Sequence, residues 1–146
     1  MQIELDYDRA GSRLCRIGEA TIAYDRAGSR PRSLGELTLE YDMVGSRLRE
    51  VGGQRIEYDR LGNRPVRVGD LEVEYDRLGN RPVRIGSVAI EYDRAGTRVR
   101  RLGDFTVDYD RLGSRPRHLK TDAGVPFDAQ MCVIVFLVLL AFKDDD

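Results

Sequence analysis

Residues 58–86 read YDRLGNRPVRVGDLEVEYDRLGNRPVRIG, so that YDRLGNRPVR occurs twice, 17 residues apart. The same spacing runs through most of the chain and includes every tyrosine in it: Tyr7, Tyr24, Tyr41, Tyr58, Tyr75, Tyr92 and Tyr109. Asp follows each tyrosine, Gly lies four residues after it, and Arg lies six residues after it. A further Gly lies eleven residues after the tyrosine in the first six copies. A fixed period of this kind is typical of a repeat architecture.

Each repeat predicts two strands. In the run LEVEY at 71–75, apolar and acidic residues alternate, which is the pattern of a half-buried strand. The shorter run PVRI at 82–85 predicts a second, weaker strand. The two-residue link Gly86–Ser87 has Gly first, as a type II′ hairpin turn requires, and the longer loop has Gly where a left-handed residue is needed. Seven repeats therefore predict an antiparallel β-meander of about fourteen strands.

The second strand of each repeat contains one irregular position. The residue ten positions after the tyrosine is always aliphatic, and we expect it to face inward. The residues seven and eight positions after the tyrosine are mixed, being Leu, Pro or Val at the first and Cys, Arg or Val at the second. Because these positions cannot all follow one alternation, we expect a β-bulge there, where proline is also tolerated.

The two ends of the repeat array predict a closed sheet. An open solenoid needs atypical terminal repeats to cap its edges, yet the first and seventh copies are as regular as the others. We therefore expect Ile3–Tyr7 to pair with Pro116–Leu119. The predicted fold class is all-β with one helix: a closed, shallow antiparallel β-meander barrel of about 14 short strands over residues 3–119, within a single domain spanning 1–146. Fourteen strands leave a lumen of roughly 12–16 Å.

The segment after the repeats is predicted to fill that lumen. Residues 129–142 read AQMCVIVFLVLLAF, apolar nearly all round, and as a helix would measure about 21 Å by 10–12 Å. We expect a central hydrophobic helix that places Val135, Phe136 and Leu139 in the core beside the seven tyrosines. Asp128 is the expected N-cap.

The connections of this helix follow from its position. Residues 120–128 are expected to cross the rim formed by the glycine turns, and the acidic tail at 143–146 to emerge at the opposite rim. Two alternatives stay open for the apolar segment, a membrane anchor and an intermolecular interface. An anchor normally needs about 20 apolar residues, more than this segment has.

Composition limits the classes of function. Charged residues make up 34% of the chain but the net charge is -1, so a nucleic-acid partner is not expected. Cys15 and Cys132 lack metal-ligand or disulfide-framework spacing, and His118 has no catalytic residues around it. We therefore expect no catalytic, cofactor-binding or metal-binding residues, no cofactor and no enzymatic activity. The start of the chain has no secretory pattern, which predicts a cytoplasmic location.

The longer loops predict a basic rim. Arg follows the Tyr–Asp pair in six of the seven repeats: Arg9, Arg26, Arg60, Arg77, Arg94 and Arg111. The Asp and the later Arg of each loop are expected to pair across the hairpin. The seven tyrosines are expected to form a ring inside the barrel near this rim, with their hydroxyls at its solvent-exposed end. The acidic tail would offset part of the positive charge.

The motif YDRLGNR is similar to the YD repeats of the bacterial RHS shell proteins, and the resemblance covers residues 3–119. Members of that family are larger cocoons with a longer period that enclose a toxin; their self-cleaving core has no counterpart here, so encapsulation is not implied. In layout, a barrel threaded by its own C-terminal helix resembles tubby-like and scramblase-like domains and the β-flower barrels. Tubby-like domains bind phosphoinositide head groups through basic residues.

These observations predict a non-catalytic binding or scaffold module that is a monomer. Its partner would be a protein or anionic lipid head groups. One alternative is a membrane-associated or lipid-associated protein that uses the basic rim or the C-terminal helix. A second alternative is a structural shell protein related to the RHS/YD repeats.

Overall fold

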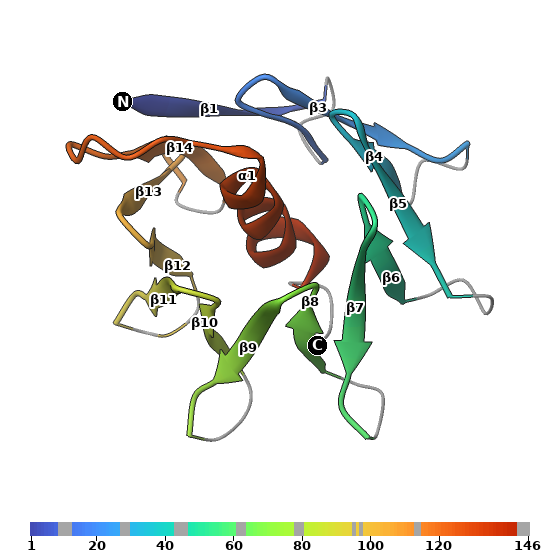
Figure 1. Cartoon of the computed structure of the whole chain (residues 1–146). Helices are drawn as coiled ribbons and strands as arrows, with labels where there is room; N and C mark the ends of the chain where they lie inside the picture. Colours follow the sequence, from blue (N-terminus) through green and yellow to red (C-terminus); the bar gives the residue numbers. More distant parts are fainter. Residues whose placement is uncertain are drawn as a thin grey trace.

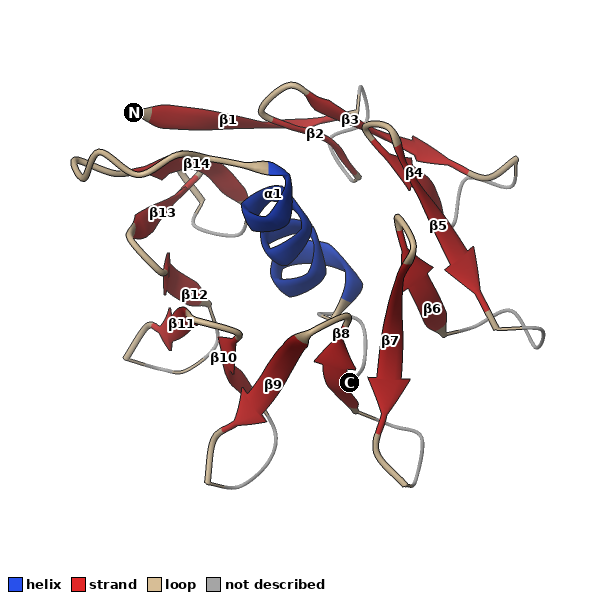
Figure 2. Cartoon of the chain, viewed as in Figure 1, coloured by secondary structure: helices blue, strands red, loops and turns tan. Residues whose placement is uncertain are grey.

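The computed structural model describes residues 1–8, 13–26, 30–42, 47–60, 64–77, 81–94, 96, 98–112 and 115–142. It contains short strands arranged in a ring around one C-terminal helix (Figures 1 and 2). The strands are β1 (Gln2–Tyr7), β2 (Leu14–Ile17), β3 (Ala20–Tyr24), β4 (Pro31–Leu34), β5 (Leu37–Tyr41), β6 (Leu48–Val51), β7 (Gln54–Tyr58), β8 (Pro65–Val68), β9 (Leu71–Tyr75), β10 (Pro82–Ile85), β11 (Val88–Tyr92), β12 (Val99–Leu102), β13 (Phe105–Tyr109) and β14 (Pro116–Lys120).

The sheet is a closed barrel in which each strand pairs with its neighbours in sequence and β14 pairs with β1. At this seam Ile3 lies opposite Leu119 and Glu4 lies opposite His118. The main chains of Met1 and Thr121 extend the ladder, with nitrogen–oxygen distances of 2.9 and 3.0 Å in the two directions. The predicted fourteen-strand antiparallel meander and its closure are therefore confirmed.

Tight turns at one rim join each repeat to the next. The first residue of these turns is a glycine with φ between 54° and 60°, a region that L-residues with side chains rarely adopt. In five of the turns the second residue is not glycine and has no positive φ, as type II′ requires. Gly52 and Gly53 both have positive φ, 54° and 87°, which fits the type I′ turn. We call this end of the barrel the glycine-turn rim.

The predicted β-bulge is present in every repeat. In the fifth repeat Glu74 lies opposite Arg84 and Tyr75 lies opposite Pro82, so Val83 is the extra residue. The residue seven positions after the tyrosine therefore faces inward, where only Leu, Pro and Val occur. The bulge residue lies outside this alternation, which explains why arginine is accepted at Arg32, Arg49, Arg100 and Arg117, all exposed.

The inner wall is lined by the aliphatic residue ten positions after each tyrosine. All seven of these side chains are 0–1% exposed: Ile17, Leu34, Val51, Val68, Ile85, Leu102 and Leu119. Each lies opposite a second apolar residue of the same repeat, as in the pair Val73–Ile85. The barrel therefore presents a continuous apolar surface to its lumen.

The C-terminal helix occupies the lumen (Figures 1 and 2). It consists of α1 (Ala129–Phe136) followed by a π-helical turn, η1 (Leu137–Ala141), so it ends one residue earlier than predicted and with a wider final turn. Residues 131–139 are all buried. Asp128 is the N-cap, as predicted, because its Oδ1 accepts from the main-chain nitrogen of Met131 at 2.9 Å.

The chain enters the lumen from the glycine-turn rim, as predicted. The ring of Phe127 packs edge-on against Phe105, which follows the turn at Gly103, with ring centroids 5.7 Å apart. A Cβ atom added to Gly18, in another turn of this rim, would lie 3.9 Å from Phe127. The predicted acidic tail at 143–146 lies outside the described residues.

The position of Phe136 gives a test of the helix as the core of the barrel. We expect Phe136→Ala to lower the free energy of unfolding by about 3–5 kcal/mol, because it leaves a cavity in a fully buried site. Gln130→Ala, on the exposed first turn of the same helix, is the matched control and should cost less than about 0.5 kcal/mol. Urea denaturation of both variants measures the difference; equal, small effects would contradict a helix packed in the lumen.

Candidate functional site

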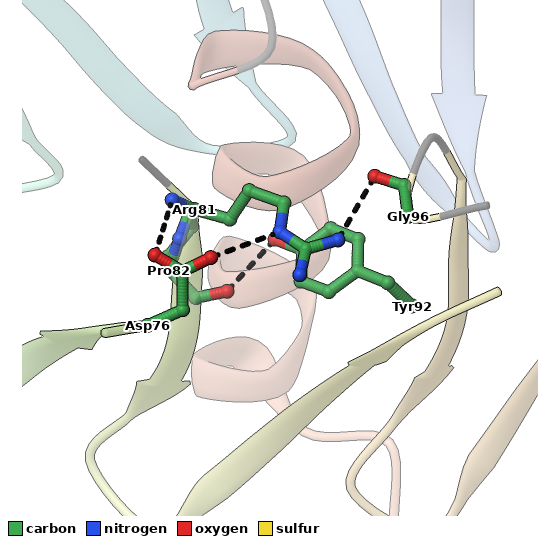
Figure 3. Close-up of polar contacts among 5 residues, drawn as sticks. All are labelled: Asp76, Arg81, Pro82, Tyr92 and Gly96. Atoms are coloured by element: carbon green, nitrogen blue, oxygen red, sulfur yellow. Dashed lines mark hydrogen bonds and ion pairs between the residues drawn. The ribbon is translucent and has the colours of Figure 1, made fainter. Parts of the chain in front are cut away.

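The tyrosine of each repeat bridges a gap between neighbouring strands. Strands β10 and β11 pair only through Arg84–Ala89 and Ile85–Val88, next to the tight turn. Farther from that turn the main chains no longer pair, and Tyr92 fills the gap instead. Its hydroxyl donates a hydrogen bond to the carbonyl oxygen of Pro82, at 2.7 Å (Figure 3). A side chain thus replaces the strand ladder at this point.

An arginine of the preceding repeat covers the tyrosine ring. The guanidinium carbon of Arg81 lies 4.4 Å from the centroid of Tyr92, within the range of a cation–π contact. Its Nε donates to Oδ2 of Asp76 at 3.2 Å, and its Nη1 donates to the carbonyl oxygen of Gly96 at 2.9 Å (Figure 3). We call the set of Asp76, Arg81, Pro82 and Tyr92, and its equivalents, the clasp.

The clasp recurs between all seven pairs of neighbouring repeats. The distance from arginine to tyrosine centroid ranges from 4.4 to 4.9 Å. The tyrosine hydroxyl lies 2.5–2.9 Å from the carbonyl oxygen. The seventh clasp crosses the seam, where Arg115 covers Tyr7 and Tyr7 donates to Pro116. The ring of clasps is therefore closed like the sheet.

The tyrosine hydroxyls have main-chain partners that the sequence did not predict. The sequence places them at the solvent-exposed end of the ring, and in the structure each donates to a main-chain carbonyl of the preceding repeat. The physical reason is that the strands diverge there and leave a carbonyl oxygen that needs a donor. The predicted Asp–Arg pairs are present in every repeat, at 2.6–3.4 Å. Sequence reasoning missed that the same arginine also contacts the next repeat.

Burial controls the acidity of the clasp tyrosines. Desolvation raises the pKa of Tyr7, Tyr41, Tyr92 and Tyr109 to about 12, although the covering arginine acts in the opposite direction. Burial likewise raises the pKa of Cys132, on the central helix, to about 11. These phenols and this thiol are therefore protonated at neutral pH and are poorly suited to act as bases or nucleophiles.

The remaining predicted core residues lie on the helix. Val135 and Phe136 are fully buried, and Leu139 is 8% exposed. The seven tyrosines are partly buried and pack against the same core from the barrel wall. The seven tyrosines and the three helix residues named from the sequence therefore pack in one core, where they stabilise the fold.

Exposed arginines mark the rim opposite the glycine turns. We call the described members of this set the arginine crown, and they are Arg26, Arg60, Arg77, Arg94 and Arg111. All five are exposed, and none has an ion pair or hydrogen bond with another described residue. Arg9 lies outside the described residues, and the third repeat has Met43 at this position.

One crown arginine borders a surface depression of about 620 Å³ between the fifth and sixth repeats. Arg94, Arg81 and Arg100 line it together with Asp76, Glu91 and Asp93. Because both signs of charge are present and the clasp uses part of the set, the depression has no strong preference for one class of ligand.

Other candidate residues have local partners on the surface. Arg49 pairs with Glu40 at 2.9 Å and Arg100 pairs with Glu91 at 2.8 Å, in each case across neighbouring strands. His118 contacts Glu4 at 3.3 Å across the seam. Cys15 and Cys132 are both free thiols. Among the described residues there is no cluster of three or more potential metal ligands.

A membrane anchor is one of the alternatives for the apolar segment that forms the central helix. No helix in the described part of the chain has the length and apolar character needed to cross a membrane.

Comparison with known proteins gives no family: no family model, curated protein or solved structure matches the chain. The predicted barrel around one C-terminal helix is confirmed by the structure. The likeness to YD repeats rests on the motif alone.

The clasp predicts a measurable energetic coupling between neighbouring repeats. We expect a double-mutant cycle of Arg81→Gln and Tyr92→Leu to give a coupling free energy of about 0.5–1 kcal/mol, as for a partly exposed cation–π contact. The control cycle combines Arg13→Gln with Tyr92→Leu; because Arg13 covers Tyr24 instead, its coupling should be close to zero. Similar values from both cycles in urea denaturation would show that the contact contributes nothing specific.

The raised pKa values of the tyrosines predict unfolding in alkali. Their folded-state pKa of about 12 lies above the ordinary value of about 10, so the unfolded chain loses these protons first. The stabilisation is complete below pH 10 and is lost as the pH rises from 10 to 12. Tyr92→Phe should make this loss shallower. Urea midpoints across the range, with tyrosinate absorbance, measure it; a midpoint independent of pH would contradict buried, protonated phenols.

Proposed function

We propose that this chain is a non-catalytic binding and scaffold module that contacts anionic groups of a partner through its arginine crown. The observation that carries the proposal is the exposure of the crown arginines, which have no ion pair with another described residue. The other charged residues of the same loops are used differently, since each Asp and each later Arg belongs to a clasp. Among the described charged residues of these loops, the crown arginines are therefore the ones without an ion pair or hydrogen bond to another described residue.

The arrangement of the crown favours a multivalent partner. Its described members lie on five of the seven long loops of one closed barrel. Guanidinium groups spread around a ring suit an extended anionic surface, because several anionic groups can be contacted at once. The non-catalytic part of the proposal is supported by the protonated state of the buried phenols and of Cys132.

An anionic lipid surface is the second candidate partner. Leu112 follows the crown residue Arg111 and is 89% exposed, and two further loops have the same Arg–Leu sequence at 60–61 and 77–78. Arginine next to an exposed aliphatic residue can contact lipid phosphates while the aliphatic group enters the interface.

The relation to YD repeats is part of the same proposal. It is supported by the fixed spacing of tyrosine, aspartate, glycine and arginine. The first two and the last of these residue types form the clasp. In this proposal the motif serves to join neighbouring repeats. A structural shell role for this chain is the alternative to partner binding.

Neutralising the crown tests the proposed function. The crown variant changes the five crown arginines to Gln. The control changes five arginines of the outer wall that have no ion pair with another described residue, Arg16, Arg32, Arg55, Arg84 and Arg117, and so alters the net charge equally. We expect the crown variant to lose about tenfold or more in affinity for immobilised heparin, a generic polyanion, because the positive charge at one end of the barrel is removed. The control should lose much less.

Equal losses in the two variants would show that only net charge matters and would refute the crown as a site. The same comparison with vesicles of phosphatidylcholine containing phosphatidylserine separates the lipid candidate. Binding to the vesicles that depends on the crown and falls in Leu112→Ser supports a lipid surface. Binding to heparin without binding to the vesicles favours a protein partner.

A further inference from the structure

Although the net charge is -1, acidic and basic side chains are concentrated at opposite ends of the barrel. Six acidic residues lie at the glycine-turn rim, opposite the arginine crown, and we call them the acidic rim: Glu19, Glu36, Asp70, Asp104, Asp122 and Asp128. The first four occupy the second position of tight turns, and the last two belong to the segment that crosses this rim toward the lumen. All six are exposed. One end of the barrel is therefore acidic and the other basic.

The acidic rim is not neutralised locally. Asp128 caps the helix, and the other five have no hydrogen bond or ion pair with another described residue. Cationic groups near this rim have other partners or none. The amino group of Met1 donates to the carbonyl oxygen of Thr121 at 2.9 Å, and Lys120 pairs with Asp108 at 2.9 Å. Arginines two residues before the turn glycines, such as Arg84, lie on the outer wall. Among the described residues, none of these groups has an ion pair with an acidic-rim side chain.

The wall between the two rims has balanced charge. Acidic residues of the first strand lie opposite arginines of the second, as in Asp6–Arg16, Glu57–Arg67 and Glu74–Arg84. The wall therefore carries both signs of charge, whereas the unpaired charge at each end is mainly of one sign. Both rims belong to one closed barrel and lie at its opposite ends. The crown of one molecule and the acidic rim of another are complementary in charge.

We propose that a second copy of this chain is a partner of the arginine crown, and that barrels stack head to tail with the acidic rim of one on the crown of the next. This inference rests on the proposed function of the crown and names its partner. The contact joins two different surfaces and does not close on itself, so it builds linear stacks. Stacking leaves the closed sheet of each barrel intact. The monomer predicted from the sequence is then expected only at salt concentrations that screen the charges of the two rims.

Two variants provide the test, and in each of them only one end of the barrel keeps the charge needed for stacking. The crown variant has its five crown arginines changed to Gln. The rim variant carries Glu19→Gln, Glu36→Gln, Asp70→Asn, Asp104→Asn and Asp122→Asn, while Asp128 is kept because it caps the helix. Circular dichroism and thermal unfolding first establish that both variants fold. Sedimentation equilibrium of the full chain then measures mass at low ionic strength and again at about 1 M salt, where the screening length is about 3 Å.

We expect the wild-type mass to rise with concentration above the monomer value of 16.6 kDa at low salt, and to return to it at high salt. Each variant alone should remain a monomer, and an equimolar mixture should reach twice the monomer mass and stop, because the dimer has no free competent end. The wall variant described above, which has the same net charge as the crown variant, should still associate like the wild type.

Three outcomes would overturn the stacking proposal: a wild-type chain that stays monomeric at low salt, a mixture no heavier than its components, or a wall variant that behaves like the crown variant. The first of these, together with crown-dependent binding to heparin, rejects the second copy as partner and leaves the proposed function standing. If the monomeric chain instead binds the anionic vesicles through its crown, the partner is a lipid surface. If neither the polyanion nor a second copy depends on the crown, both proposals fail.

Discussion

The contact on which this barrel depends is the arginine that lies between its own aspartate and the tyrosine of the next repeat. Each tight turn pairs its two strands over only two residue pairs, too few to hold neighbouring hairpins together along their length. The tyrosine hydrogen bond and the arginine over its ring take over where the main chains separate. Diverging strands widen the barrel at one end without leaving main-chain carbonyls unsatisfied. Seven such contacts therefore allow short strands to close around a helix.

Closure and the central helix require each other. Fourteen strands enclose a lumen that inward side chains alone cannot fill, and the apolar residues 131–139 would be costly to leave in water. The seven fully buried aliphatic residues of the wall and Val135, Phe136 and Leu137 of the helix form one core. The end of the array supplies both the strand that completes the sheet and the segment that fills it. Neither the sheet edges nor the apolar helix surface at 131–139 is then left uncovered.

Much of this architecture could be predicted because it depends on local rules. The period, the alternation at 71–75, the glycine turns and the conflict that required a bulge are all visible in one repeat. Closure followed from the regularity of the terminal repeats. The Arg81–Tyr92 contact could not be predicted, because it depends on the strands separating in space. One signal was present: tyrosine, aspartate and arginine never vary among the seven copies. The crown positions could be identified from the sequence. Only the structure shows that these arginines have no ion pair with another described residue.

The variation among repeats separates structural from functional positions. Recent duplication would explain identity everywhere, but the third, fifth and eighth residues after the tyrosine do vary, as Ala, Val or Leu, as Ser, Asn or Thr, and as Cys, Arg or Val. Tyr, Asp and the later Arg do not vary, and the clasp accounts for all three. The crown position is Arg in six of seven repeats, yet no contact among the described residues requires it. The partner proposed above would explain why this exposed position keeps one charged residue type while the residue after it varies.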